Sequence, residues 1–367
     1  IRAKGAIADS DKYPRWNIIG RYEGKNSGDC VHFNSHTDVV EVGHGWTTDP
    51  FGAEHRDGKI FGRGACDMKG GLATSIIAAE AFIATYPNFN GSIEISGTAD
   101  EESGGFGGVA YLAEKGHFEN VNHVIIPEPL NKDRVCIGHR GVWWAEIETK
   151  GRIAHGSMPF LGDCAVRHMG AILEEMEEKL FPALKNKKTN MPVVPEGAKQ
   201  STLNINSIHG GESEQEDDYT GLPSPCVPDR CKIVIDRRFL IEEKLPEVKL
   251  EVYELLNNLK ENRKNFDFEI RDMHEVHPTM APMDALVVTT ISKAIEDVLG
   301  KPAEHVVSPG TYDQKHIDRI GKLNNCVAYG PGILDLAHQP DEWIGVDDMV
   351  DSAKIMGKAL TSFHSVK

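Results

Sequence analysis

The sequence has fewer basic than acidic residues: 40 lysines and arginines stand against 56 aspartates and glutamates, which gives a formal charge of −16. A surface with this excess of negative charge repels the phosphates of nucleic acids and anionic membranes. We therefore expect neither nucleic acid nor a membrane as a partner. An acidic substrate would have to be attracted locally, by bound metal ions or by an arginine.

The sequence also lacks long apolar runs and paired cysteines. No stretch is long and apolar enough to span a membrane, and no signal peptide is visible. The seven cysteines are odd in number, and Cys226 and Cys231 resemble half of a zinc site without a second pair. This usage predicts reduced thiols in a cytoplasmic protein.

The first motif with chemical potential is Ser35-His36-Thr37-Asp38, which follows an apolar, strand-like run. On an extended strand the side chains at positions i and i+2 face the same way, so His36 and Asp38 can share one face. A neutral imidazole binds a metal through one nitrogen and usually presents its other N–H to a carboxylate. His36 is therefore a candidate ligand and Asp38 its orienting carboxylate. Taken alone, the motif would be better interpreted as a loop cap at a strand end.

Asp67 lies in a glycine-rich segment, residues 62–71, ahead of an apolar helix. Glycines allow backbone conformations closed to other residues, so the carboxylate can be held at a sharp turn and bridge two cations. A plain helix N-cap is the alternative interpretation. A phosphate cradle is disfavoured, because neither GxGxxG nor GxxxxGK[ST] occurs here.

Two adjacent carboxylates, Glu101 and Glu102, follow the strand-like residues 93–96. Neighbouring side chains at a strand end point in different directions, so one carboxylate can bind metal while the other handles protons. We assign Glu102 as a ligand and Glu101 as the base. On its own, this acidic stretch would be read as a solvated turn.

Glu128 and His338 complete the candidate set. Glu128 stands between Pro127 and Pro129 after an apolar strand, on a segment that the prolines make stiff. His338 follows the Gly-Pro-Gly turn of residues 330–332. A single histidine in a loop is more often incidental, so His338 gains its weight from the other four positions.

The five candidate ligands fit one hydrolytic site with two divalent cations. Two such cations against three carboxylates leave one net positive charge, which suits a centre that holds hydroxide and polarises a carbonyl. Histidine and carboxylate ligands suit zinc, and cobalt or manganese are also compatible. The ligands are His36, Asp67, Glu102, Glu128 and His338.

The order of strand-like and helical patterns predicts an α/β protein with two domains, as the length also suggests. Residues 15 to about 138 alternate between strand and helix, and the strands end at the motifs, where open α/β sheets bind ligands. From about 140 to 273 the pattern is strand, helix, strand, helix, strand, with 3.6-residue periodicity at 165–180 and 248–259 and an acidic loop at 210–218. Residues 284–300 predict a helix capped by Asp284, which begins the return to the first domain.

These motifs resemble the M20 family of metallopeptidases and amidohydrolases, in particular its acetylornithine deacetylase and succinyl-diaminopimelate desuccinylase branch. They occur in family order from about residue 17 to the C-terminus. The matching strings are SHTDVV, GWTTDPFGAEHRDGKIFGRGACDMKGG, TADEESGG, PEP, RGVWWAEIETKGRIAHGSMP, VPDRCKIVIDRRF, GTYDQ, YGPG and AHQPDEW.

The resemblance implies a zinc-exopeptidase-like fold and a role for each candidate ligand. The catalytic domain, residues 1–139 and 274–367, would hold a mixed, mostly parallel sheet flanked by helices. Residues 140–273 would form a smaller α+β domain for dimerisation or as a lid. In the catalytic domain, Asp67 would bridge two metals, with His36 and Glu128 on one and Glu102 and His338 on the other.

The resemblance also implies contacts with the substrate and with a second subunit. His155, in Ala154-His155-Gly156-Ser157, matches a histidine that reaches the active site of the partner in a homodimer. Arg238 matches the arginine that holds a substrate carboxylate, and Thr311 falls in the substrate loop. The chain departs from the branch at Gln314, Lys315 and His316, where Gly-Arg-Phe is more usual, and just before Pro228-Asp229, where the branch has Asn. Both departures are expected to touch substrate contacts.

The function that the resemblance implies is hydrolysis of the amide bond in a small N-acyl amino acid or a related carboxylate-bearing amide. A hydroxide bridging the metals would attack, with Glu101 as the general base and Asp38 supporting His36. A dipeptidase, an aminoacylase or a hydrolase of an unusual amide or arylamine is the alternative within the enzyme class. A non-catalytic metal-binding homologue is the alternative from another class, but such a protein has no need of a free base at Glu101.

Overall fold

The computed structural model describes residues 1–211 and 225–366, and the chain forms two compact units. Unit 1 comprises Ile1–His139 and Thr279–Lys367, and unit 2 comprises Arg140–Pro278. The sequence places the return to the first domain at residue 274, but strand β11 (Asp267–Val276) extends the sheet of unit 2 beyond that point. Most of the loop predicted at 210–218 lies outside the described residues.

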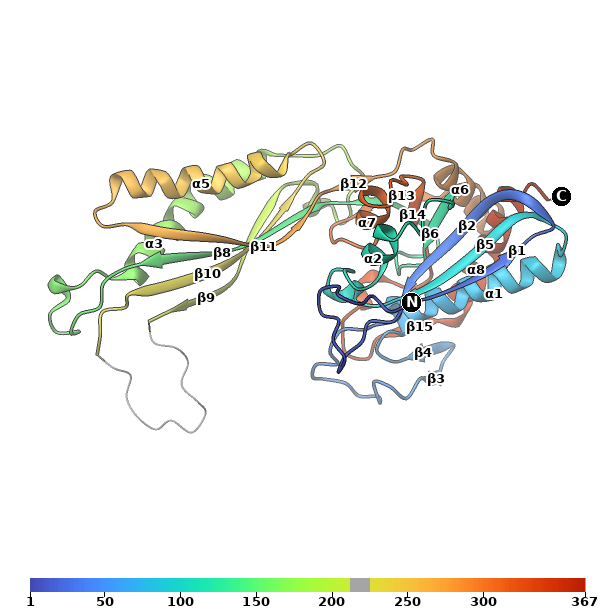
Figure 1. Cartoon of the computed structure of the whole chain (residues 1–367), viewed down its shortest axis with the longest axis horizontal. Coiled ribbons are helices and arrows are strands. Elements are labelled where there is room, and N and C mark those ends of the chain that lie inside the picture. Colours follow the sequence, from blue (N-terminus) through green and yellow to red (C-terminus); the bar gives the residue numbers. More distant parts are fainter. Residues whose placement is uncertain (212–224, 367) are drawn as a thin grey trace. The chain divides into compact units, whose positions relative to one another are not determined.

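Unit 1 is built on a mixed sheet of eight strands, counted within the described residues (Figure 1). The strand order is β1-β5-β2-β6-β14-β7-β12, and β13 also pairs with β7. β5, β2, β6 and β14 are parallel, whereas β1, β7 and β12 each join an antiparallel neighbour. The predicted fold class, a mixed sheet flanked by helices, is confirmed. The strands are β1 (Ile18–Glu23), β2 (Asn26–His36), β5 (Asn90–Thr98), β6 (His123–Ile126), β7 (Arg134–His139), β12 (Thr279–Met280), β13 (Glu304–Ser308) and β14 (Cys326–Ala328).

The central strands of this sheet are buried. Residues 30–36 of β2 and all of β6 are buried, as expected for parallel strands with both faces covered. Helix α8 packs against both α1 and α6, and α2 packs against α7. These helices are α1 (Gly70–Thr85), α2 (Val109–Glu114), α6 (Leu286–Leu299), α7 (Gln314–Arg319) and α8 (Val346–Phe363).

A second, small antiparallel sheet in unit 1 has the strand order β15-β4-β3. It pairs a C-terminal strand with a hairpin that precedes the glycine-rich segment around Asp67, so it brings two regions with candidate ligands together. The strands are β3 (Glu54–Arg56), β4 (Lys59–Phe61) and β15 (Trp343–Gly345).

Unit 2 is a four-stranded antiparallel sheet with helices packed against it. Its order is β11-β8-β10-β9, and alternate residues of β10 are buried, which is the pattern of a sheet covered on one face. The helices predicted at 165–180 and 248–259 are present. The elements are β8 (Gly141–Lys150), β9 (Thr202–Gly210), β10 (Arg230–Phe239), α3 (Ala165–Glu175) with its continuation Met176–Leu180, α4 (Phe181–Asn186) and α5 (Leu245–Asn262).

The predicted cap of helix α6 is wrong. The helix begins at Leu286, and its flanking residue Ala285 makes no side-chain capping bond. The side-chain oxygen of Asn325 instead accepts the backbone N–H of Val287, at 3.0 Å. An orphan donor of the first turn is therefore satisfied by a residue that lies after the helix in the chain.

Among the described residues, no helix combines the length and the apolar character that crossing a bilayer requires. All seven cysteines lie in the described part of the chain, and none of them forms a disulfide.

Candidate metal centre

Three neighbouring strands of unit 1 end at the same edge of the sheet, and a candidate site residue lies at or just after the end of each. β5, β2 and β6 are parallel, with His36 opposite Thr98 in the register. His36 is the last residue of β2, whereas Glu101 follows the end of β5 and Glu128 the end of β6. Carboxyl ends of parallel strands meet at one edge, so the fold collects these side chains there.

Asp67 reaches the same place from a five-residue helical turn, Ala65–Lys69, that precedes α1. Its backbone has φ −117° and ψ 97°, and the flanking position of the turn is Gly64, which has φ 80° and makes no side-chain cap. The alternative that Asp67 is a plain helix N-cap is therefore not what the structure shows. The turn points a carboxylate away from the helix.

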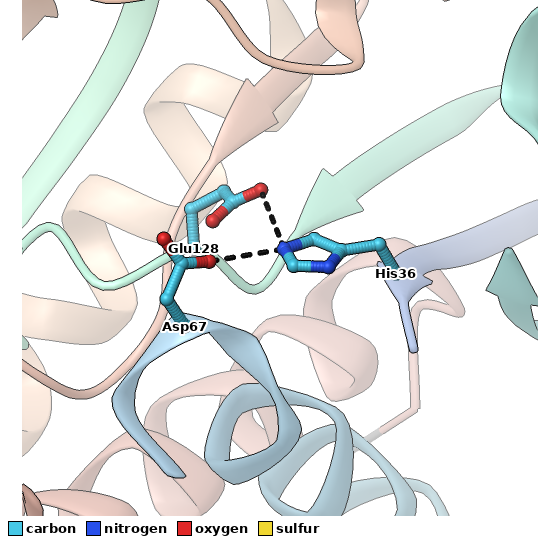
Figure 2. A group of neighbouring side chains, drawn as sticks. All are labelled: His36, Asp67 and Glu128. Atoms are coloured by element: carbon cyan, nitrogen blue, oxygen red, sulfur yellow. Dashed lines mark hydrogen bonds and ion pairs between the residues drawn. The ribbon is translucent and has the colours of Figure 1, made fainter. Parts of the chain in front are cut away.

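The first group of candidate ligands is His36, Asp67 and Glu128. Figure 2 shows the imidazole of His36 facing both carboxylates. Its Nε2 atom lies 3.0 Å from Oδ1 of Asp67 and 3.9 Å from Oε1 of Glu128. His36 is 1% exposed and Glu128 is 7% exposed, so this group is enclosed by protein.

The second group is Asp67, Glu102 and His338, and it shares Asp67 with the first. Nε2 of His338 lies 3.1 Å from Oε2 of Glu102 and 3.5 Å from Oδ2 of Asp67. The two oxygens of Asp67 thus face different histidines. The side chain of His338 is 49% exposed, so this group is more open than the first.

The charges of these groups perturb one another strongly. Hydrogen bonds to Asp67 and Glu102 raise the pKa of His338 to about 10. Burial raises the pKa of Asp67, but hydrogen bonds with His338 and His36 outweigh it and hold the pKa below its usual range. Burial and the nearby charge of Asp67 raise the pKa of Glu128 well above its ordinary value. The carboxylates of the two ligand groups therefore carry more negative charge than the imidazoles of His36 and His338 can neutralise.

The donor set fits divalent cations. Oε1 of Glu102 is buried and has no hydrogen-bond partner within the described residues, which is unusual for a carboxylate oxygen. A cation beside it would satisfy that oxygen and would offset the charge that raises the pKa of Glu128. Imidazole and carboxylate donors are the ligands that zinc, cobalt and manganese accept.

Asp38 acts differently from the sequence-based expectation. Nδ1 of His36 lies 3.1 Å from the backbone oxygen of Asp38 and 3.6 Å from its carboxylate. The carboxylate accepts the backbone N–H groups of Glu101 and Glu102, at 3.2 and 3.1 Å. Asp38 therefore orients His36 mainly through its backbone, while its side chain ties the end of β2 to the Glu101–Glu102 turn.

Glu101 lies beside the ligands with its own buried partner. Its Oε1 atom is 3.5 Å from the ammonium of Lys315, which is 4% exposed. Burial raises the pKa of Glu101 to about 7, although the charge of Lys315 opposes the shift. A carboxyl group with this pKa can accept and release a proton near neutral pH.

The substrate loop contains a correction. Thr311 is half-buried between β13 and α7. Gln314, expected to touch substrate, is 1% exposed and donates to the backbone oxygens of Ile137 and Cys326. Lys315 is buried against Glu101, so two of the three residues that depart from the branch in this loop belong to the interior of unit 1.

Two charged residues of the centre escaped the sequence reasoning. Arg63 and Glu342 form a buried ion pair, with Nη1 of Arg63 2.6 Å from Oε2 of Glu342. The other oxygen of Glu342 accepts the backbone N–H groups of Cys66 and Asp67. The only signal for them in the sequence is that both charged residues lie inside the motifs that match the family. A charged side chain that is buried in such a motif needs a partner.

His155 and Arg238 belong to unit 2, whereas the residues above belong to unit 1. His155 is exposed, and its Nδ1 atom accepts the backbone N–H of Ser157 at 3.1 Å. Nε2 must then carry the proton of the neutral ring and can donate it. Arg238 makes two bonds to the carboxylate of Asp236, at 2.6 and 2.9 Å, so in this structure one edge of its guanidinium is already engaged.

Comparison with known proteins agrees with the site. The sequence profile of peptidase family M20/M25/M40 matches residues 32–362. The succinyl-diaminopimelate desuccinylase of Hydrogenovibrio crunogenus is 28% identical over 342 residues, which cover 91% of this chain and 83% of that protein.

Solved structures share the fold. An M20 family metallo-carboxypeptidase from Sulfolobus solfataricus gives a TM-score of 0.76 at 18% identity, covering 98% of this chain and 90% of that one. Human carnosine dipeptidase 1 gives 0.73 at 20% identity, covering 95% and 83%. The family profile spans most of the chain and includes all five candidate ligands, so the protein belongs to peptidase family M20/M25/M40 and is a hydrolase of that family.

Proposed function

We propose that this protein is a two-metal amidohydrolase that cleaves the amide bond of a small N-acyl amino acid or a related amide bearing a carboxylate. One observation carries the proposal: the two oxygens of Asp67 belong to two adjacent ligand groups, and the buried carboxyl group of Glu101 interacts electrostatically with His36 of one group and Glu102 of the other. A bridging carboxylate with a separate base is the arrangement that amide hydrolysis by two cations needs.

Each ligand has a defined place in this proposal. When metal is bound, Asp67 would be shared by the two cations, His36 and Glu128 would hold one of them, and Glu102 and His338 would hold the other. Zinc suits these donors, and cobalt or manganese can replace it.

The reaction is divided between the cations and the protein. When bound, the cations polarise the scissile carbonyl and lower the pKa of water. Glu101 takes a proton from the attacking water and later delivers it to the leaving amine, which needs a carboxyl group with a pKa near neutrality. Asp38 keeps Glu101 and Glu102 in place through their backbone N–H groups. The buried setting strengthens each of these interactions relative to water.

Two observations support the proposed substrate class: the activity of a similar protein and the presence of Arg238, which can bind a carboxylate. A similar protein is a succinyl-diaminopimelate desuccinylase, so we place an N-succinyl or N-acetyl amino acid first among the candidates. Arg238 would hold the substrate carboxylate, which requires its bonds to Asp236 to share or yield a donor. Thr311 would line the substrate loop.

We also propose that the enzyme is a cytoplasmic homodimer. His155 would reach the site of the partner and donate Nε2–H to the oxyanion that forms at the scissile carbonyl, because Ser157 occupies Nδ1. The seven free thiols favour a reducing compartment.

A substrate panel tests the proposal. Purified protein loaded with zinc, cobalt or manganese is assayed against N-acetyl, N-succinyl and N-carbamoyl amino acids and dipeptides, with and without chelator. We expect turnover of an N-acyl amino acid that chelation abolishes and added metal restores. Turnover of dipeptides alone would replace the substrate assignment, and full activity in metal-free protein would contradict the mechanism.

A further inference from the structure

The buried pair Arg63–Glu342 connects the two loops that supply Asp67 and His338. The side chain of Glu342 is 0% exposed and that of Arg63 is 2% exposed. On one side, Oε1 of Glu342 accepts the backbone N–H of Cys66 at 2.8 Å and that of Asp67 at 3.0 Å. The carboxylate of Glu342 therefore binds the backbone of Asp67, the proposed bridging ligand.

On the other side, the guanidinium of Arg63 donates hydrogen bonds to the loop that carries His338. Nη2 donates to the backbone oxygen of His338 at 3.3 Å and to that of Val42 at 3.1 Å. Nη1 donates to the backbone oxygen of Gln339 at 3.3 Å as well as to Glu342. A rigid guanidinium fork thus spans three backbone oxygens and one carboxylate, which an ammonium cannot do.

The loop that carries His338 needs such support because its conformation is unfavourable in isolation. His338 has φ 64° and Asp341 has φ 53°, in the left-handed region that residues with a side chain rarely adopt. The carboxylate of Asp341 accepts bonds from the backbone and side chains of Thr47 and Thr48. Tertiary hydrogen bonds therefore determine where the imidazole of His338 lies.

The two ligand groups differ in how much they depend on this pair. His36 and Glu128 follow adjacent parallel strands, and their separation is set by the ladder between β2 and β6. Asp67 and His338 lie on two loops outside the main sheet. The β4–β15 ladder and a backbone bond from Gly62 to Glu342 bring these loops together, and the Arg63–Glu342 pair extends that connection to the backbones of Asp67 and His338 themselves. A loss of the pair should therefore disturb the group of Asp67, Glu102 and His338 more than the other.

We propose that Glu342 and Arg63 are positioning residues that set the distance between Asp67 and His338, and that they thereby control the affinity of one of the two metal sites. The inference rests on the proposed two-metal function but concerns residues to which that function gives no role. Residues that orient metal ligands typically contribute 10- to 100-fold to metal affinity.

The test measures metal binding directly. Glu342→Gln retains the shape of the side chain but places an NH₂ group where an acceptor oxygen faced Arg63 or the backbone N–H groups. Zinc content per chain is measured against buffers of defined free zinc, and the visible absorption of Co²⁺ reports on ligand geometry. We expect the wild-type protein to bind two equivalents, and Glu342→Gln to lose roughly 10- to 100-fold in affinity at one site only, with an altered Co²⁺ spectrum.

Matched variants separate positioning from charge and from folding. Asp335→Asn removes an exposed carboxylate from the segment before His338 and should leave both affinities unchanged. Arg63→Lys keeps the charge but not the fork and should weaken the same site. If Glu342→Gln does not fold, the double variant Arg63→Met/Glu342→Leu replaces the buried pair with apolar side chains, which proteins often tolerate. It should fold and still show the selective loss.

Wild-type affinities at both sites in the folded variants, or equal weakening of both sites, would overturn the inference. A different result would contradict the proposed function. If the wild-type protein never binds a second equivalent of metal, the two-metal site itself is refuted before any variant is measured.

Discussion

The ammonium of Lys315 lies 3.5 Å from a carboxylate oxygen of Glu101, and the lysine is almost fully buried. The resemblance to the family placed position 315 among substrate contacts. The structure makes it the partner of Glu101, the proposed base. Burial raises the pKa of Glu101 to about 7, and the charge of Lys315 limits the rise.

Lys315→Met should therefore move the acidic limb of the kcat/KM profile to higher pH. Removing a cation beside a carboxyl group favours its protonated form, and a protonated Glu101 cannot accept a proton from water. Profiles of the wild type, Lys315→Met and Lys315→Arg measure the effect, with the arginine variant expected to restore the wild-type limb. Lys322→Met changes an exposed lysine nearby and serves as the control; an unchanged limb in Lys315→Met would refute the role.

Glu101→Gln and Glu102→Gln form a matched pair. Glu101→Gln should lower kcat by roughly 10² to 10⁴ while metal content stays at the wild-type level, because a base is lost and not a ligand. Glu102→Gln should lower metal content and activity together. Metal analysis beside steady-state kinetics separates the two residues. Loss of metal in Glu101→Gln would make Glu101 a ligand instead.

The metal-free protein should become less stable as the pH rises. The pKa of His338 is about 10 in the folded state against an ordinary 6.5, so its stabilisation is complete below 6.5 and lost as the pH rises through about 10. Glu101, with a pKa raised from 4.5 to about 7, changes stability in the same direction at lower pH. Urea unfolding with chelator at about pH 6 and about pH 9 measures the slope.

His338→Gln is the control for this dependence, because it removes a group whose pKa is raised from 6.5 to about 10. Its metal-free form should have a flatter slope between about pH 6.5 and about pH 9. Protein with bound zinc should also show a flatter slope, since a metal-bound imidazole carries no titrating proton in this range. A metal-free wild type that gains stability over this interval would contradict the prediction.

His155→Ala should lower kcat by roughly 10² or more without loss of metal, because a donor to the oxyanion is removed. Mixing inactive His155→Ala with inactive Glu101→Gln under subunit exchange should regenerate activity, since one shared site in each mixed dimer is intact. Ser157→Ala tests the support of the imidazole and should have a smaller effect than His155→Ala. A fully active monomer would refute the shared site, as would mixed dimers that stay inactive after demonstrated exchange.

The candidate ligand positions can be predicted from the sequence because each follows a local pattern. His36 ends an apolar run, Asp67 stands among glycines and Glu128 stands between prolines, and parallel strands bring their ends to one edge of a sheet. Helices with strong periodicity, such as α3 and α5, were predictable for the same reason.

Contacts between distant segments could not be predicted in this way. Asn325 caps α6 in place of Asp284, and Gln314 donates to backbone oxygens inside the protein. The end of unit 2 also lies beyond the predicted residue, because β11 continues to pair with β8 as far as Val276. The composition of the sequence and the periodicity of its apolar residues do not indicate which residue a polar side chain will bond to.

The amino-acid sequence alone determined the family, the donor types and the strand ends that carry them, since these depend on residues close together in the chain. Only the tertiary structure decided that Lys315 faces Glu101 and that Arg63 joins Glu342, 279 positions away. A buried charge must be paired, but the chain can satisfy that requirement with many partners. The packing of the whole unit selects one of these partners, because the folded unit fixes both the burial of each charge and the position of its partner.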